Sequence, residues 1–166
     1  MRAISLAEAN KIIEGTFAAA EKLECYALSA IVLDAGGRVK SYQKQDGCSL
    51  LRFEISYGKA FAALAMGRSS RMVLQKQREK PAFMASLESL SDGPLFMEAG
   101  GQLIRDETGE VVGAIGVTGD VNEMDDICAM EGIRSAGFKS DEDFDEATQK
   151  RLNIKKNPPI KDPRKK

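Results

Sequence analysis

The chain has no histidine and no tryptophan, and only three cysteines among its 166 residues. Because imidazole is the side chain that titrates nearest neutral pH, proton transfer in this protein would have to use carboxylate, lysine or tyrosine groups. The cysteines, at positions 25, 48 and 128, are too widely spaced for a metal or redox motif, and their odd number argues against a disulfide framework. The sequence therefore predicts reduced thiols and no metal site.

Charge of one sign and long apolar runs are also lacking. Lys and Arg total 24 against 25 for Asp and Glu, so no overall electric field favours nucleic acid or a membrane surface. The longest fully apolar run, Ala60 to Met66, is far too short to span a bilayer. The first ten residues lack the apolar core of a secretory signal. With 43% hydrophobic and 30% charged residues, we expect a soluble, cytoplasmic globular protein.

Hydrophobic periodicity predicts a mixture of helices and strands. Ser5 and Glu8 form a capping box, and apolar residues then recur at helical spacing to about Leu23. Hairpin-length connections between the strands imply antiparallel pairing, so we expect a single α+β domain with a five-stranded antiparallel sheet flanked by helices. The expected strands are residues 27–34, 38–43, 95–97, 102–105 and 111–118, and the expected helices are 6–23, 50–66, 70–80, 82–90 and 122–135.

The character of the chain changes near Lys139. Residues 141–146 are acidic, residues 155–166 are basic, and three prolines in the basic part oppose regular structure. We therefore expect a domain over residues 1–138 and a tail over residues 139–166, which is either solvated or laid as an arm on a neighbouring subunit. A nucleic-acid-binding arm is less favoured, because the basic part has no interleaved aromatic residues.

Three charged side chains are candidate pocket groups. Lys59 lies beside an apolar helical face, so its ammonium either reaches past apolar neighbours to solvent or points into a pocket as a ligand for an anion. Asp34 and Asp46 each occur at a glycine-containing turn, where an aspartate caps the turn or, alternatively, faces a pocket as a carboxylate. If the protein is an enzyme, Lys59, Asp46 and Tyr57 are the candidate catalytic residues, and each would need a shifted pKa.

Glycines gather in one strand and before another. Gly113, Gly116 and Gly119 precede a helix with a spacing that matches neither the dinucleotide fingerprint nor a P-loop. Acidic residues follow at 120–126 and would repel a phosphate, so we favour close packing of strand against helix for Gly113 and Gly116. Thr118 and Gly119 at the strand end, with the Gly100–Gly101 pair, are candidates to line a pocket.

Several short segments occur in an order that is typical of one protein family. They are Leu33-Asp34-Ala35-Gly36-Gly37, Gln45-Asp46-Gly47, Lys59-Ala60 followed by small residues, Gly100-Gly101, the Gly113–Gly119 strand, and Met124-Asp125-Asp126 with Cys128-Ala129. In this ordered set, over about residues 3–137, the chain resembles the GlcG/HbpS-like haem-binding family, which includes the C-terminal domain of PduO-type proteins. The resemblance implies a small α+β domain that assembles as a homo-oligomer, with relatives described as haem-binding, haem-degrading or corrinoid-associated.

The histidine that binds haem iron in that family has no counterpart here. We therefore expect no haem cofactor, and Cys48 is the most credible substitute for an iron ligand. The leading hypothesis is a homo-oligomer that binds a small polar or carboxylate ligand. Its pocket would lie where Asp34, Asp46, Lys59, Gly100, Gly101, Thr118 and Gly119 converge. The alternatives are a lyase, isomerase or hydratase that uses the same pocket, a haem protein with a ligand other than histidine, and a pure interaction module.

Overall fold

The N-terminal helix begins where its capping box predicts. In the computed structural model, which describes residues 2–165, α1 spans Leu6–Lys22. The Ser5 hydroxyl accepts a hydrogen bond from the Glu8 N–H at 3.1 Å, and the Glu8 carboxylate accepts one from the Ser5 N–H at 2.9 Å. Both amide groups at the helix start are thereby satisfied, which sets the first residue of the helix.

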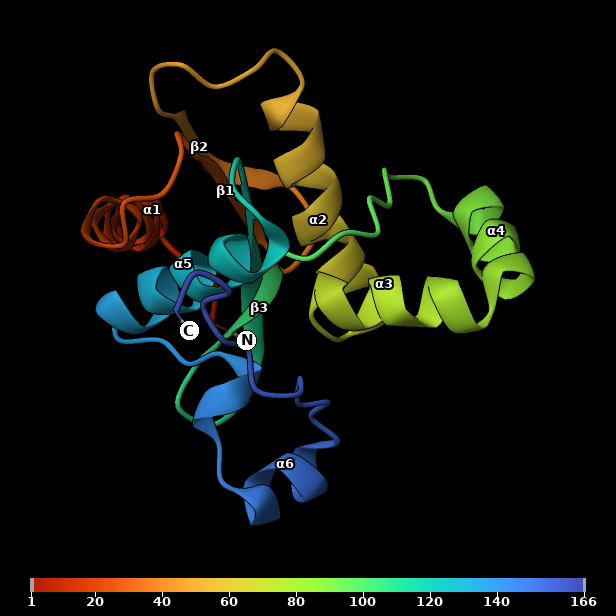
Figure 1. The fold of residues 1–166 in the computed structure, drawn as a ribbon. Helices are drawn as coiled ribbons and strands as arrows, with labels where there is room; N and C mark the ends of the chain where they lie inside the picture. Colours follow the sequence, from red (N-terminus) through yellow and green to blue (C-terminus); the bar gives the residue numbers. More distant parts are fainter. Residues whose placement is uncertain (1, 166) are drawn as a thin grey trace.

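The sheet has four antiparallel strands in the order β2–β1–β4–β3 (Figure 1). They are β1 (Ser29–Asp34), β2 (Val39–Lys44), β3 (Gly101–Arg105) and β4 (Val111–Thr118). The predicted α+β class with an antiparallel sheet is confirmed. The prediction of five strands is wrong.

Residues 95–97 form a loop instead of the fifth strand. The Phe96 N–H donates to the Gly58 carbonyl oxygen of α2 (Arg52–Met66) at 3.2 Å, so this backbone pairs with a helix and not with a sheet edge. Gly58 permits the approach, because a Cβ at that position would overlap the Phe96 side chain. This short apolar stretch therefore packs on α2, although its sequence alone resembles a strand.

Helices cover both faces of the sheet. α1 and α5 (Asn122–Ser135) pack together on one face, and α2 packs on the other. Side chains alternate along β1, so Ala30 and Val32 join the first core whereas Ile31 and Leu33 join the second. Burial on both faces explains why β1 has so few polar residues.

Close contact between β4 and α2 depends on a glycine. A Cβ at Gly116 would overlap the backbone carbonyl oxygen of Ser56, which is fixed within α2. The helix can therefore lie this near to the strand only if position 116 has no side chain. This contact supports the close-packing interpretation of Gly116 over a phosphate-binding role.

Two helices extend away from the sheet. α3 (Ser70–Glu79) and α4 (Pro81–Leu90) are separated at Pro81, as the sequence predicts. α4 is the element farthest from the sheet on its side of Figure 1, and it leaves Phe83 and Leu90 51% and 81% exposed. Within residues 2–165, every helix is too short or too polar to cross a membrane.

The first part of the C-terminal segment is attached to the sheet and is not free in solvent. Lys139 forms an isolated antiparallel bridge with Arg105 of β3, and the Arg105 guanidinium donates to Asp141 at 2.6 Å in a buried ion pair. The acidic stretch forms a 3₁₀ turn, η1 (Asp141–Asp143), and a short helix, α6 (Glu146–Leu152). The described residues beyond α6 form no further helix or strand, which agrees with the effect expected of the prolines.

Candidate functional site

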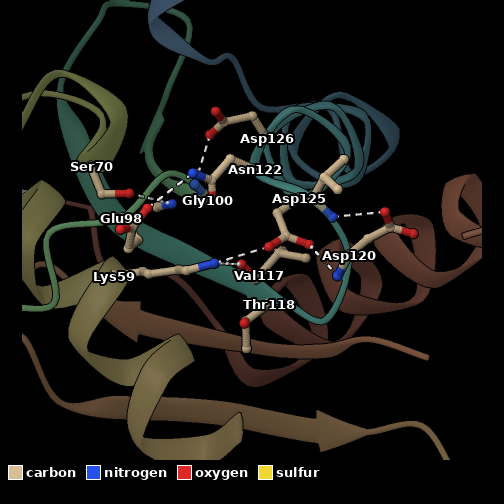
Figure 2. A network of polar contacts seen from close by, with 12 residues as sticks. Lys59, Ser70, Glu98, Gly100, Val117, Thr118, Asp120, Asn122, Asp125 and Asp126 are labelled. Atoms are coloured by element: carbon tan, nitrogen blue, oxygen red, sulfur yellow. Dashed lines mark hydrogen bonds and ion pairs between the residues drawn. The ribbon is translucent and has the colours of Figure 1, made fainter. Parts of the chain in front are cut away.

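A buried polar network lies where α2, β4 and α5 meet (Figure 2). At its centre the Lys59 ammonium donates to the Val117 carbonyl oxygen at 2.9 Å and to Asp125 Oδ2 at 3.0 Å. Lys59 is 2% exposed and Asp125 is 1% exposed, so solvent does not screen the pair. Lys59 therefore neither reaches solvent nor presents an unpaired ammonium to a pocket.

Asp125 is held on both carboxylate oxygens. Its Oδ1 accepts a hydrogen bond from the Asp120 N–H at 3.0 Å, which ties the β4–α5 turn to the first turns of the helix. Burial raises the pKa of Asp125 to about 6, because desolvation outweighs the opposing effect of the Lys59 ammonium. The carboxylate therefore depends on Lys59 to remain ionised in the interior.

The neighbouring Asp126 bonds to three further residues, on α3, on β3 and in the loop before β3. Its Oδ2 accepts from Arg71 Nε of α3 at 2.6 Å, and its Oδ1 accepts from the Gly100 N–H at 2.9 Å and from Gln102 Nε2 at 2.8 Å. Burial is the largest influence on the Asp126 carboxyl and raises its pKa, against the effect of Arg71. Asp126 thus fixes α3 and the start of β3 against α5.

The Gly100–Gly101 pair makes room for this network. Gly100 has a φ of +117°, and a Cβ there would overlap the Val117 carbonyl oxygen and lie 3.0 Å from Lys59 Nζ. The Gly101 N–H donates to Ser70 Oγ at 2.7 Å, and a Cβ on Gly101 would overlap the Lys59 carbonyl oxygen. The structure therefore brings Lys59, Gly100 and Gly101 together in a packed interior, whereas the sequence predicts that they line a pocket.

Thr118 and Gly119 lie at the edge of the same network. Thr118 follows Val117 in β4, and its Oγ1 accepts a hydrogen bond from Arg52 Nη1 at 2.8 Å. Gly119 has a φ of +147°, and a Cβ there would overlap the Ala27 carbonyl oxygen. Thr118 and Gly119 directly follow Val117, which accepts from Lys59, and the Thr118 hydroxyl is bound to Arg52.

The two aspartates at turns lie at opposite ends of β1, and neither bonds to the network. Asp34 Oδ1 accepts from the N–H groups of Gly36 and Arg38 at 2.9 and 3.1 Å, which is a turn cap. Asp46 is exposed in the turn that follows β2. Asp34 pairs with Gly113 at one end of β1, whereas Thr118 pairs with Ser29 at the other, roughly 17 Å away along the strand.

Tyr57 also points to the far end of β1. Its hydroxyl donates to the Gly37 carbonyl oxygen at 3.3 Å, in the turn that Asp34 caps. Lys59, Asp46 and Tyr57 thus lie in three different places, and the structure does not assemble the set of proton-transfer groups that the sequence suggests.

Sequence reasoning misses Arg71 and the roles of Asp125 and Asp126. It interprets the acidic residues at 120–126 only as a favourable charge at a helix start. A signal is available in the helical spacing, because Asp125 shares a face with Cys128 and Ala129, which are both buried. An acidic residue on a buried helical face requires a cationic partner, and Lys59 supplies it.

Two open hollows flank the C-terminal segment. One, of about 450 Å³, lies between α3 and residues 158–161 and is lined by Arg71, Arg78, Glu123 and Lys161 among others. The second, of about 610 Å³, lies between residues 159–165 and α5. Within residues 2–165, no three His, Cys, Asp or Glu side chains are grouped to hold a metal ion.

Removal of the Lys59 charge should destabilise the fold. Lys59→Met keeps a similar side-chain length but leaves the buried Asp125 carboxyl without its cationic partner, so that Asp125 must either stay charged at a high cost or take up a proton. The free energy of unfolding should therefore fall by roughly 3–5 kcal/mol. In the double variant Lys59→Met/Asp125→Asn neither charge remains. The decrease in its free energy of unfolding should be smaller than the sum of the decreases in the two single variants. Urea unfolding of the three variants measures both quantities.

Lys11→Met is the matched control, because Lys11 is exposed on α1 and the substitution should change stability by about 0.5 kcal/mol or less. If Lys59→Met unfolds at the same urea concentration as Lys11→Met and the unmodified protein, the buried pair does not have the structural role described above.

The fold resembles that of several solved proteins, although no curated protein matches the chain. The crystal structure of a PduOC–haem complex has a TM-score of 0.73 at 22% identity, covering 84% of this chain and 99% of that one. Protein ORFY of Klebsiella pneumoniae has a TM-score of 0.74 at 21% identity, covering 82% and 92%. A double mutant of Streptomyces reticuli HbpS has a TM-score of 0.70 at 23% identity, covering 81% and 87%.

These identities establish a shared fold and do not transfer a ligand. The sequence model of one family, described as haem degrading protein HbpS-like, matches residues 4–134, which span the sheet and helices α1 to α5 except the last residue of α5. The chain therefore belongs to the HbpS-like family.

Proposed function

We propose that this HbpS-like protein binds a small anionic ligand, such as a carboxylate, in the hollow between α3 and residues 158–161. The observation that carries the proposal is the state of Arg71. Its Nε is bound to Asp126, whereas its Nη2 is buried and has no hydrogen-bond partner among the described residues. An unsatisfied buried guanidinium N–H is costly, and a carboxylate is the group that fits its planar donor geometry best.

The surrounding charges favour an anion. Arg78 follows Arg71 by two helical turns and lines the same hollow, and Lys161 approaches from the C-terminal segment. Among the described residues, Glu123 is the only acidic one that lines the hollow, and its carboxylate lies 3.9 Å from Arg71 Nη1. A volume of about 450 Å³ is within the range of small-molecule sites.

In this proposal Lys59, Gly100 and Gly101 act as framework. They do not touch the ligand: Lys59 holds the adjacent Asp125, and the Gly100 N–H holds Asp126, which in turn orients Arg71. The ligand class is that expected from the sequence, and the cationic group that binds it is Arg71. Enzymatic activity is not proposed, because Lys59, Asp46 and Tyr57 do not share a cleft.

Citrate, succinate and inorganic phosphate test the proposal by isothermal titration calorimetry at constant ionic strength. We expect at least one carboxylate to bind at a single site. Arg78→Gln and Lys161→Gln should each weaken that binding roughly fivefold, because each removes an exposed charge worth up to about 1 kcal/mol.

Lys150→Gln removes a charge from exposed α6, outside the hollow, and should leave the affinity unchanged. Absence of binding by both carboxylates, or an equal effect of all three substitutions, would contradict the proposal.

Haem is the ligand of the PduOC complex, but the donors of this chain do not suit it. The sequence has no histidine, so imidazole ligation is impossible. Burial raises the pKa of Cys48 and of Cys128, which disfavours the thiolate form that binds iron. Cys128 is also fully buried in the core between α5 and α1.

Haemin titration should therefore give no sharp, saturable shift of the Soret band, and the purified protein should be colourless. A stoichiometric shift that disappears in Cys48→Ala would restore haem binding through a thiolate. A shift that survives in Cys48→Ala would indicate another ligand and would equally contradict the prediction.

We also propose that the chain assembles as a homo-oligomer, as the family resemblance implies. Apolar side chains support this: Phe83 and Leu90 protrude on α4, and Leu50 is 88% exposed before α2. Light scattering at micromolar concentration should report at least a dimer. Phe83→Ser/Leu90→Ser should lower the mass if α4 lies in the interface, and a monomeric unmodified protein would contradict assembly.

A further inference from the structure

We infer that Cys25 and Cys128 form a reversible intramolecular disulfide when the folded protein meets a low-molecular-weight disulfide. The two residues are 103 positions apart, yet the fold places their sulfur atoms 3.9 Å from each other. The sequence alone does not predict this pair, because the two cysteines are far apart in the chain and an odd number of cysteines argues against a disulfide framework. The third thiol, Cys48, lies in the β2–α2 connection and has no thiol partner among the described contacts.

The positions of the two thiols suit a cross-link. Cys25 lies in the short connection between α1 and β1, where the neighbouring Glu24 has a φ of +53° and ends the helix. Cys128 is on α5, which packs along α1. A disulfide bond is about 2.05 Å long, so the sulfurs must approach by roughly 2 Å. Side-chain rotation in the irregular Cys25 connection can supply most of this movement without shifting either helix.

Access to the two thiols sets the order of the steps. Cys25 is half-buried, whereas Cys128 is fully buried. The Cys25 thiolate attacks one sulfur of a disulfide such as glutathione disulfide, which forms a mixed disulfide and releases the first thiol. The Cys128 thiolate then attacks Cys25 Sγ and releases the second thiol. The two protons lost by the protein are taken up by the two released thiolates, so the protein is oxidised and one disulfide is reduced.

Neighbouring charges act on Cys25 in both directions. Arg164 Nη2 donates to the Leu23 carbonyl oxygen at 2.7 Å, and this guanidinium favours the Cys25 thiolate. Burial and the nearby carboxylates of Asp120 and Asp125 oppose it, and together they raise the pKa of the thiol. Exchange is therefore slow, and the pair is reduced until an oxidant is supplied.

The experiment uses the folded full-length protein incubated with glutathione disulfide, then denatured and alkylated. Mass spectrometry should show that Cys48 alone is alkylated. Digestion without reduction should yield a linked peptide containing Cys25 and Cys128. After reduction with dithiothreitol, all three cysteines should be alkylated. The oxidised protein should also unfold at a higher temperature than the reduced protein, because the cross-link restricts the unfolded chain.

Three variants make the test decisive. Cys128→Ala should stop the reaction at a glutathione adduct on Cys25, Cys25→Ser should prevent it, and Cys48→Ser should leave it intact. Oxidation in denaturant is a further control: in the unfolded chain the Cys25–Cys48 link, which closes the shortest loop, should form in preference to Cys25–Cys128. The inference is overturned if the folded protein keeps both thiols, accumulates the Cys25 adduct, or links Cys48 as readily as Cys128.

Discussion

The buried pairing of Lys59 with Asp125 is the interaction on which the rest of this structure depends. Each group loses its hydration on folding, and only the other group, the Val117 carbonyl and the Asp120 amide replace it. The pairing requires α2, β4 and α5 to be in register at once, because each element contributes one partner. Asp126 extends the same requirement to α3 and β3 through Arg71 and Gln102. Because the cost of desolvating both charges offsets much of their attraction, we expect the pair to fix the arrangement of these elements more than to add net stability.

This constraint explains the ordered motifs by which the family is recognised. Lys59-Ala60, Gly100-Gly101 and Asp125-Asp126 resemble a ligand site in the sequence, because they combine charged side chains with glycines. In the folded chain they satisfy one another, and the glycines provide the space that Lys59 occupies. A shared fold does not imply a shared ligand: the PduOC structure contains haem, whereas this chain has no imidazole to bind its iron.

The cationic hollow and the thiol pair both lie outside this frame but are positioned by it. Asp126 holds Arg71 at the wall of the hollow, and α5 carries both Asp126 and Cys128. The C-terminal segment contributes Lys161 to the hollow and Arg164 to the surroundings of Cys25. Binding and thiol chemistry would therefore respond to the same segment, which the family match at residues 4–134 does not include.

The sequence by itself determined the local elements. The capping box set the start of α1, and Pro81 separated α3 from α4. The bounds predicted for β4 and α5 match those observed. These features depend on neighbours within a few residues, where hydrogen bonding and backbone geometry are decisive. Only the tertiary structure decided that residues 95–97 pair with α2, that Asp34 caps a turn far from Thr118, and that Lys59 meets Asp125. It also decided that Cys25 meets Cys128, because contacts across a hundred residues depend on which faces pack and leave no local pattern in the chain.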